Sequence, residues 1–455
     1  MNTTIELFEK KSFKVVKEIS PKKRKNVTFI SEKSSPFCLD DVLDNDLCCG
    51  CGTCVGACPF NILDIDLGNL QNPYLIADCP DLDIDLLSIR QIAKEQGIEV
   101  DPIYGAHINF ALGYHTDTKK RLNSASGGVA TAILEYMLDT KQVDCVIVIG
   151  MSGEFPELRI IRYSKDVAQS QQSKYGYIPL GVAWTELRKT KESFAFVGLP
   201  CHISGFNKTA NIFKSLKKQC KLKIGLFCGY SQTYDSIELF KYKTDAKKGI
   251  FKGWREGPYP GGVHIDNKLI PYNKMMNISI PFYTMQRCLS CEDGLSEEAD
   301  IVLGDSHRSG DDKNMILIRT HLGNRILHEV KEHKYIEYKY ISKEVADNGT
   351  VGAVARAKGS YAYIYNKTKK KLGLQTVTFG IDKTFSKKLF VVGTVKSFLL
   401  SWSNKYFVKW FGFNKYIGLF GYIFYNFPAS IKWNKRNIEN IKSAYKEVYI
   451  EYEKK

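Results

Sequence analysis

The chain has 455 residues, of which 44% are hydrophobic, a formal net charge of +16 and thirteen cysteines. This length suggests two or three domains, and the hydrophobic content is ample for packed cores. The basic charge favours anionic partners. No zinc-finger or RNP-like motif occurs in the sequence, however, so we exclude nucleic acid and expect anionic cofactors or an anionic membrane surface.

The cysteines indicate a reducing compartment. No secretory signal precedes them, and no run reaches the roughly 20 apolar residues that a membrane-spanning helix needs. We therefore expect a cytoplasmic protein whose thiols hold metal instead of forming disulfides.

The first motif in the chain is a compact cysteine run. It consists of Cys48, Cys51, Cys54, Cys58 and Pro59. The spacing C-x2-C-x2-C-x3-C-P is that of bacterial ferredoxins and predicts a 4Fe–4S cluster, whereas zinc sites usually present two separated pairs. In two-cluster ferredoxins the fourth cysteine of the run binds the other cluster. The Cys79-Pro80 pair therefore offers an alternative fourth ligand, and both Cys58 and Cys79 stay open.

From about residue 106, short apolar runs alternate with helical patterns. We expect helices over 126–138, over 179–189 and from 198 onward, and strands over 145–149, 194–197, 223–227, 301–303 and 315–319. Strands separated by helices of this length predict an α/β fold with a mostly parallel sheet covered on both faces.

A second set of cysteines lies in the loops of this region. Cys201 follows Gly-Leu-Pro after one predicted strand, Cys228 ends the next, and Cys288 and Cys291 form a C-x2-C pair. Open α/β sheets hold their ligands at the carboxyl ends of neighbouring strands, and four thiolates are enough for a second 4Fe–4S cluster. A lone cysteine is more commonly a buried small residue, and we give that role to the remaining candidates Cys38, Cys145 and Cys220.

A serine- and glycine-rich stretch precedes the first helix. Ser124, Ser126, Gly127 and Gly128 offer a hydroxyl cap and bare N–H groups at a helix start, which suits a phosphate or pyrophosphate. A capped helix with close-packed glycines would look the same. No G-x-G-x-x-G occurs, which disfavours a Rossmann dinucleotide site.

Two polar residues beside these loops are candidate catalytic residues. They are His202 and Asp305, and for each the alternative is a structural capping role.

The motifs, taken together and in this order, resemble the coenzyme F420 hydrogenase/dehydrogenase beta-subunit family, which includes the plant and cyanobacterial chlorophyll-pathway reductases. The resemblance covers roughly residues 30–345. Its motifs span 124–131, 173–175, 198–202, 226–229, 254–262, 287–291 and 299–305.

The resemblance implies a flavoprotein oxidoreductase with FAD, in which 4Fe–4S clusters exchange single electrons with the flavin. The flavin then carries out a two-electron step with a deazaflavin or another small molecule. The implied ligands of the second cluster are Cys201, Cys228, Cys288 and Cys291. The implied FAD neighbourhood is Ser124, Ser126, Gly127, Gly128, Thr131 and Lys174. Relatives often carry Gly-Thr-Pro-Cys-Gln where this chain has Gly-Leu-Pro-Cys-His, at 198–202. Only one N-terminal cysteine run is complete, so we expect one ferredoxin-type cluster and two clusters in total.

The last 75 residues differ from the rest of the chain. They contain 14 Lys and Arg against 5 Asp and Glu, a net charge of +9, and many aromatic residues. Interleaved rings and lysines are typical of a segment that lies on an anionic membrane surface. An aromatic-rich helical cap on the core is the alternative.

We therefore expect four parts. They are a basic arm (1–35), a ferredoxin-type segment (36–100), an FAD and Fe–S catalytic domain (101–345) and a basic, aromatic-rich helical region (346–455). The expected function is electron transfer from a ferredoxin or deazaflavin partner through two clusters to FAD and a small-molecule substrate. The alternatives are an electron-transfer subunit without its own substrate, and a role in membrane-associated glycan biosynthesis with peripheral contact at the inner membrane face.

Overall fold

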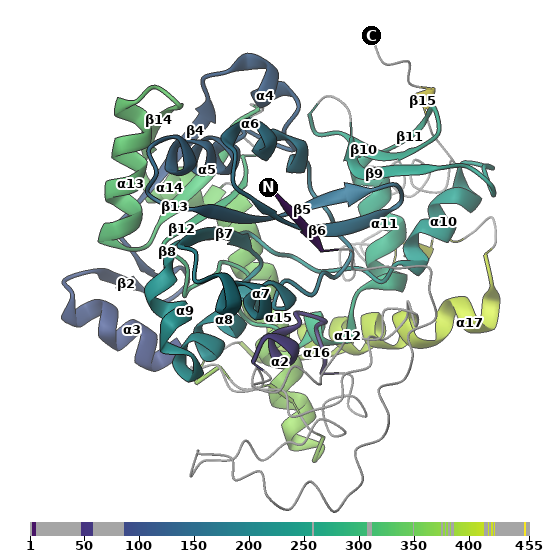
Figure 1. The fold of residues 1–455 in the computed structure, drawn as a ribbon. Coiled ribbons are helices and arrows are strands. Elements are labelled where there is room, and N and C mark those ends of the chain that lie inside the picture. The colour runs from purple at the N-terminus through teal and green to yellow at the C-terminus, as the bar shows by residue number, and fades with distance from the viewer. Residues whose placement is uncertain are drawn as a thin grey trace, which may run out of the picture.

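The computed structural model has a nine-stranded sheet at its centre (Figure 1). The described residues are 2–5, 47–57, 86–256, 259–306, 312–348, 350–374, 376–377, 379–380, 383, 386–413, 417, 420–421, 423 and 450–451. The strands in spatial order are β1 (Thr3–Ile5), β6 (Phe155–Ile161), β5 (Cys145–Ser152), β7 (Phe194–Gly198), β8 (Cys220–Leu226), β12 (Ile301–Asp305), β13 (Asn314–Ile318), β4 (Asn109–His115) and β14 (Ile336–Ile341). The predicted ligands Cys58 and Cys79, and also Cys38, lie outside the described residues.

The sheet is mixed. Its four central strands, β5, β7, β8 and β12, run parallel, and the other neighbouring pairs are antiparallel. The predicted α/β fold is confirmed, but the prediction of a mostly parallel sheet is wrong. β6 returns from β5 through Gly153 and Glu154, and a two-residue hairpin leaves no helix in the sequence to indicate an extra strand.

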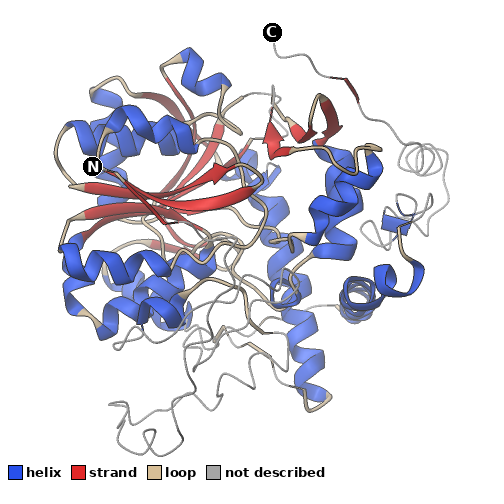
Figure 2. Ribbon diagram, turned by 45° about the vertical axis from the view of Figure 1, so that its right-hand side comes forward, coloured by secondary structure: helices blue, strands red, loops and turns tan. Residues whose placement is uncertain are grey.

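Helices cover both faces of the sheet, as predicted (Figure 2). One layer consists of α5 (Val129–Asp139) and α13 (His321–Glu332), and the other of α7 (Val182–Thr190), α8 (Pro200–Ile212) and α9 (Lys214–Gln219). Strand residues alternate between the two layers. In β5, Val146 and Val148 pack in the first layer, while Cys145 and Ile147 pack in the second. Cys145 is therefore a buried core residue, as predicted.

One edge of the sheet collects the predicted site loops. The parallel strands β5, β7, β8 and β12 all end there, and β4 joins them because both β4 and β12 are antiparallel to β13. The segments that follow β4, β7 and β8 carry the serine and glycine stretch, Cys201 and Cys228, and Asp305 is the last residue of β12. This topology explains how motifs far apart in the sequence meet.

Smaller elements surround the central sheet. A second sheet contains β9 (Phe251–Glu256), β10 (Gly262–Ile265), β11 (Lys268–Pro271) and β15 (Ile450–Glu451), and a third contains β2 (Glu99–Asp101) and β3 (Gly105–His107). The remaining helices before residue 350 are α2 (Thr53–Ala57), α3 (Leu86–Glu95), α4 (Thr118–Leu122), α6 (Ser164–Val167), α10 (Asp235–Lys243), α11 (Tyr272–Tyr283), α12 (Gln286–Leu289) and α14 (Lys343–Asn348).

The predicted helical C-terminal region is confirmed for its described part. It contains α15 (Thr350–Lys371), α16 (Lys387–Trp402), a π-helical segment (Ser403–Phe407) and α17 (Val408–Phe411). These helices pack against α11 and α12, below the sheet in Figure 1. Among the helices of the described residues, none combines the length and the apolar character needed to cross a membrane.

Candidate cofactor site

The first cysteine loop is compact and largely buried. Cys51 and Cys54 are buried, Cys48 is partly buried, and the N–H of Gly50 donates to the Sγ of Cys48 at 3.4 Å. Gly50 and Gly52 adopt positive φ angles of 65° and 75°, which glycine tolerates without strain. Amide donors to ligand sulfurs are among the interactions that set the reduction potential of Fe–S clusters.

The electrostatics of this loop fit a metal cluster. Burial, with smaller contributions from the neighbouring thiols of Cys51 and Cys54, raises the pKa of Cys48 to about 12. A bound cation reverses this effect, because a thiol that coordinates metal is deprotonated. No Asp or Glu is among the groups that shift the pKa of Cys48. The three neighbouring thiols are therefore a suitable donor set for iron.

The loop is fixed against the sheet-covering helices by contacts that only glycine allows. The N–H of Gly181 donates to the carbonyl of Cys51 at 2.9 Å. A Cβ atom at Gly56 would overlap the backbone of Gly181, and one at Gly205 would overlap the hydroxyl of Thr53. Because Gly205 belongs to α8, the helix that carries Cys201 in its first turn also holds the first cysteine loop.

Cys201 and Cys228 occupy equivalent places on neighbouring parallel strands. Gly198 of β7 pairs with Gly225 of β8, and each cysteine follows its paired glycine by three residues. The side chain of Cys228 is buried and that of Cys201 is partly buried. The prediction that both lie at the carboxyl edge of the sheet is confirmed.

Hydrogen bonds connect this edge to the C-x2-C pair. The N–H of Cys228 donates to the carbonyl of Gly294 at 2.9 Å, just beyond Cys291. The N–H of Ser231, three residues after Cys228, donates to the Sγ of Cys288 at 3.4 Å. The structure thus brings Cys228 and the pair Cys288 and Cys291 into one region, with a backbone donor already directed at a sulfur.

Within the part of the chain that the structure describes, no three His, Cys, Asp or Glu side chains converge closely enough to hold a single ion. In a 4Fe–4S cluster each cysteine binds a different iron, so the sulfurs stand farther apart than the ligands of one ion.

Arg287 connects the two cysteine sets. It directly precedes Cys288, its side chain is buried, and its charge opposes the rise in the pKa of Cys48. The guanidinium also lies over the ring of Phe379, 6.0 Å from the ring centre. A buried positive charge between the two sets favours negatively charged groups in both.

The C-terminal helices hold the C-x2-C pair from outside. The Asn366 side-chain amide, on α15, donates to the carbonyl of Ser290 at 2.9 Å and to Glu292 at 3.2 Å. The hydroxyl of Ser401, on α16, donates to the side-chain oxygen of Gln286 at 2.8 Å. Our reading of the sequence missed both contacts, because neither residue belongs to a motif and both lie more than 70 positions away from the pair.

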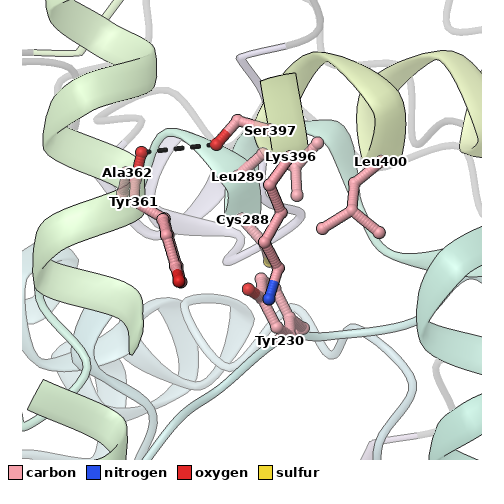
Figure 3. A pocket seen from close by; sticks show the side chains of 8 residues that line it. All are labelled: Tyr230, Cys288, Leu289, Tyr361, Ala362, Lys396, Ser397 and Leu400. Atoms are coloured by element: carbon pink, nitrogen blue, oxygen red, sulfur yellow. Dashed lines mark hydrogen bonds between the residues drawn. The ribbon is translucent and has the colours of Figure 1, made fainter. Parts of the chain in front are cut away.

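A small pocket opens beside Cys288 (Figure 3). Its volume is about 10 Å³, room for about one water molecule. It is lined by Tyr230, Cys288, Leu289, Tyr361, Ala362, Lys396, Ser397 and Leu400. Figure 3 shows Lys396 extending from α16 toward Tyr230, and the Lys396 ammonium lies 4.7 Å from the centre of the Tyr361 ring. The C-terminal helices therefore place polar and aromatic groups next to a predicted cluster ligand.

The predicted flavin residues come together at the same sheet edge, but hydrogen bonds within the protein occupy most of their polar groups. The hydroxyl of Ser126 donates to the carbonyl of Lys313 at 2.7 Å. The side-chain amide of Gln171 donates to the hydroxyls of Ser124, at 2.8 Å, and Thr131, at 3.4 Å. These bonds fix the shape of the stretch.

The two glycines of the stretch are required by packing. A Cβ atom at Gly127 would lie 2.6 Å from the backbone of Asn314 and Gly113, and Gly128 adopts a φ of 78°. The first N–H of α5, at Val129, donates to the side chain of Asn314 at 3.0 Å. The close-packing interpretation therefore explains both glycines, and a ligand would use the neighbouring groups.

The best fit to an anionic cofactor is the loop around Lys174. Its ammonium donates to the carbonyls of Ser170 at 2.8 Å and Gln172 at 2.9 Å, and desolvation lowers its pKa to about 7. Among the residues that the structure describes, none is a hydrogen-bond partner of the buried Ser170 hydroxyl or of the buried side-chain oxygen of Gln172. The Lys174 ammonium also donates to the carbonyl of Gln171, so its three N–H groups are all used within the loop. The Ser170 and Gln172 oxygens are the atoms that a polar ligand would complete.

The two candidate catalytic residues have structural partners. The Nδ1 of His202 accepts the N–H of Leu199 at 3.1 Å, so its Nε2 carries the proton and donates to the carbonyl of Ile178 at 2.8 Å. Burial lowers the pKa of His202 to about 4, which keeps the ring neutral near pH 7. Both nitrogens being occupied, the geometry favours the capping role for His202.

Asp305 forms an ion pair that our reading of the sequence did not anticipate. Its carboxylate lies 2.6 Å from the guanidinium of Arg255, which also donates to the carbonyl of Ala125 at 2.7 Å. Arg255 is buried. Its place within the motif over 254–262 was the one feature of the sequence that could have indicated this ion pair. The pair connects the second sheet to the serine and glycine stretch.

Three family models match the chain. Residues 111–183 match the N-terminal domain of the coenzyme F420 hydrogenase/dehydrogenase beta subunit, and residues 191–344 match the C-terminal domain of the same family. Residues 41–64 match the 4Fe-4S binding domain. The order of these matches is the order of the motifs described above.

Curated relatives are similar over most of the chain. The coenzyme F420-dependent sulfite reductase of Methanocaldococcus jannaschii is 26% identical over 71% of this chain, which spans only 56% of that protein. An F(420)H(2) dehydrogenase subunit of Methanosarcina mazei is 25% identical over 65% of this chain and 86% of its own length. The coenzyme F420 hydrogenase beta subunit of Methanothermobacter thermautotrophicus is 23% identical over 60% of this chain and 99% of its own.

A solved structure shares the fold. A chain of the F420-reducing NiFe hydrogenase complex from Methanosarcina barkeri superposes with a TM-score of 0.50 and 20% identity, over 62% of this chain and 99% of its own. The matched domains establish the relationship, and the shared fold agrees with it. The chain belongs to the coenzyme F420 hydrogenase/dehydrogenase beta-subunit family, with a 4Fe–4S binding domain ahead of its two beta-subunit domains.

Proposed function

We propose that the protein is a cytoplasmic Fe–S flavoprotein oxidoreductase, with two 4Fe–4S clusters and FAD, that acts on a deazaflavin or another small molecule. The observation that carries the proposal is the proximity of the two cysteine sets, which Arg287 and α8 connect, next to the strand ends that precede Cys201 and Cys228. When bound, the clusters move single electrons and the flavin couples them to a two-electron step.

The first cysteine set is the proposed point of electron entry. Cys48, Cys51 and Cys54 would hold the first cluster, with Cys58 or Cys79 as the fourth ligand. The contact of this loop with α8, at Gly205 and Thr53, keeps it at a fixed position relative to Cys201. A fixed separation supports electron transfer between the two sets, because the protein mainly supplies spacing and electrostatics.

Cys201, Cys228, Cys288 and Cys291 would hold the second cluster. Two features of the chain prepare it for a negatively charged group. The backbone N–H of Ser231 already points at the Cys288 sulfur, and Arg287 adds a buried positive charge. Both stabilise negative charge on the sulfurs.

The FAD proposal is supported by the polar groups at the strand ends. Lys174 supplies a cation for a pyrophosphate, and Ser170 and Gln172 supply unmatched polar atoms. Ser124, Ser126, Gly127, Gly128 and Thr131 form the adjoining wall. The Arg255–Asp305 pair holds this wall in place through the carbonyl of Ala125.

The deazaflavin proposal is supported by the names of the relatives. One is an F420-dependent reductase, and two others are subunits of an F420H2 dehydrogenase and an F420 hydrogenase. The two subunits favour the second candidate, an electron-transfer subunit that serves a partner enzyme. The matched families and these three relatives give no support to a role in glycan assembly, and we do not propose one.

Turnover by the isolated chain distinguishes the two candidates. The anaerobic full-length protein is mixed with reduced F420 and an artificial one-electron acceptor, and F420 oxidation is followed by its absorbance. An oxidoreductase with its own site turns over, whereas a subunit without one does not. Cys291→Ser should abolish this activity, and Cys220→Ser, at another partly buried cysteine, should retain it.

A further inference from the structure

The end of the C-terminal helices carries a cluster of exposed rings. Trp410 and Phe411 on α17 are 64% and 57% exposed, and Tyr406 is 41% exposed. The rings of Tyr406 and Trp410 stack with their centres 5.3 Å apart. We call Tyr406, Trp410, Phe411 and Phe413 the aromatic tip. Among the described residues, no other segment exposes so many large rings in sequence.

The opposite side of the same helical segment is anchored to the protein body. Phe407 is 4% exposed and stacks on Phe282 of α11, with ring centres 4.9 Å apart. The hydroxyl of Ser403 donates to the carbonyl of Pro281 at 2.5 Å. These contacts fix the rotation of the segment, so the outward direction of the aromatic tip is a property of the fold.

The sequence around the aromatic tip is basic. The 56 residues between Asp382 and Glu439 contain ten Lys and Arg and no Asp or Glu. Lys409 is exposed and lies between Tyr406 and Trp410 in sequence, and the partly buried Lys405 is one helical turn earlier. Exposed rings interleaved with lysines are complementary to a surface that is apolar below and anionic above.

We propose that the aromatic tip docks on an anionic phospholipid bilayer, with its rings at the headgroup level and Lys405 and Lys409 facing the lipid phosphates. Soluble monomers rarely leave contiguous apolar patches exposed, and aromatic rings with polar edges favour the membrane interface. The proposal is independent of the redox function. It would hold the redox centre close to a membrane while the chain stays outside the bilayer.

Vesicle flotation of the full-length protein tests the proposal. One set of vesicles is pure phosphatidylcholine, and the other contains about one-third phosphatidylglycerol. We expect flotation with the anionic vesicles only, and a loss of binding at high salt. Lys405→Gln with Lys409→Gln should weaken binding roughly 5-fold for each lysine. Trp410→Ser with Phe411→Ser should weaken it about ten-fold or more.

Matched controls separate the aromatic tip from general surface effects. Ile92→Ser on α3 removes a side chain that is 55% exposed, and Lys217→Gln with Lys218→Gln removes two exposed lysines from α9. Both should bind like the original chain. Trp410→Phe should keep binding but lose most of the fluorescence quenching by lipids with brominated acyl chains, because it removes the tryptophan at the tip.

Three results would overturn the proposal. They are absence of flotation with anionic vesicles, flotation that the tip variants leave unchanged, and quenching that persists in Trp410→Phe. Light scattering measures the oligomeric state and tests whether the tip instead contacts a second copy of the chain. The tip would be a dimer interface if the original chain is a dimer that does not bind vesicles and the Trp410→Ser, Phe411→Ser variant is a monomer.

Discussion

Asn366, on a helix beyond the matched beta-subunit domains, donates its side-chain amide to the carbonyl of Ser290, between Cys288 and Cys291, at 2.9 Å. The same amide donates to Glu292, and the hydroxyl of Thr376 donates to the Asn366 oxygen. The C-terminal region thus supports the segment that carries the second cysteine set, and would orient these cysteines if they bind the proposed cluster.

Asn366→Ala should loosen the C-x2-C pair. The carbonyl of Ser290 would lose a buried donor, and we expect a cost of about 1–3 kcal/mol in unfolding free energy. Iron bound by the second set should fall and its EPR signal should broaden, while the first cluster stays. Thr368→Ala, on the same helix, is the control and should retain both signals, because the Thr368 hydroxyl contacts Ile364 and Thr394 and not the C-x2-C pair. Equal loss of both clusters would show a general folding defect instead.

His202 should make the protein less stable in mild acid. Its pKa is about 4 in the folded protein and about 6.5 in a model peptide, so the unfolded state binds more protons between these values. The free energy of unfolding therefore falls as the pH drops from about 6.5 to 4. His202 alone accounts for about 3 kcal/mol of this decrease. Chemical denaturation at a series of pH values should show this slope in the original chain and lose it in His202→Gln.

The shape of the pH–rate profile distinguishes a cap from a catalytic acid. If His202 acts only as a cap, His202→Gln keeps the profile of the original chain and changes only its stability. If the pH–rate profile of His202→Gln loses one of its limbs, His202 acts as a catalytic acid or base and not only as a cap.

Lys174→Met should lower the flavin content without changing the iron content. The ammonium is the cation of the loop, and its pKa of about 7 means that it loses charge as the pH rises through neutrality. An anionic cofactor should therefore be held less tightly above pH 7 than below it, and the variant should lose this dependence. Flavin absorbance after gel filtration at pH 6 and pH 8 measures both effects. Lys165→Met, on the surface helix α6, should behave like the original chain.

Arg255→Met should be strongly destabilising. It leaves the carboxylate of Asp305 without its buried partner, and breaking such a pair costs about 3–5 kcal/mol. Arg255→Met combined with Asp305→Leu should cost less than Arg255→Met alone, because no charge is then left unpaired. A double variant less stable than the single one would mean that the pair does not act as a unit.

The sequence predicted the centre of the fold well. The helices expected over 126–138 and 179–189 form at Val129–Asp139 and Val182–Thr190, each beginning three residues later than expected. At the first, Gly128 has a positive φ, and at the second, Gly181 packs against the first cysteine loop. Periodicity shows which residues are buried, but the close contacts that delay a helix start depend on the tertiary structure.

The parts that could not be predicted depend on distant partners. The antiparallel strands joined to the sheet lack intervening helices, as between β5 and β6. Asn366 and Ser401 contact the C-x2-C region from outside any motif. The serine and glycine stretch looked like a bare anion site, yet Asn314 and Gln171 occupy its N–H and hydroxyl groups. In each case a residue remote in sequence decides what the local pattern does.

Cofactor content tests the central claim most directly. Iron, acid-labile sulfide and flavin are assayed in the full-length protein after anaerobic purification. Two 4Fe–4S clusters and one FAD predict about eight irons, about eight sulfides and about one flavin per chain. About four irons, or no extractable flavin, would contradict the two-cluster flavoprotein.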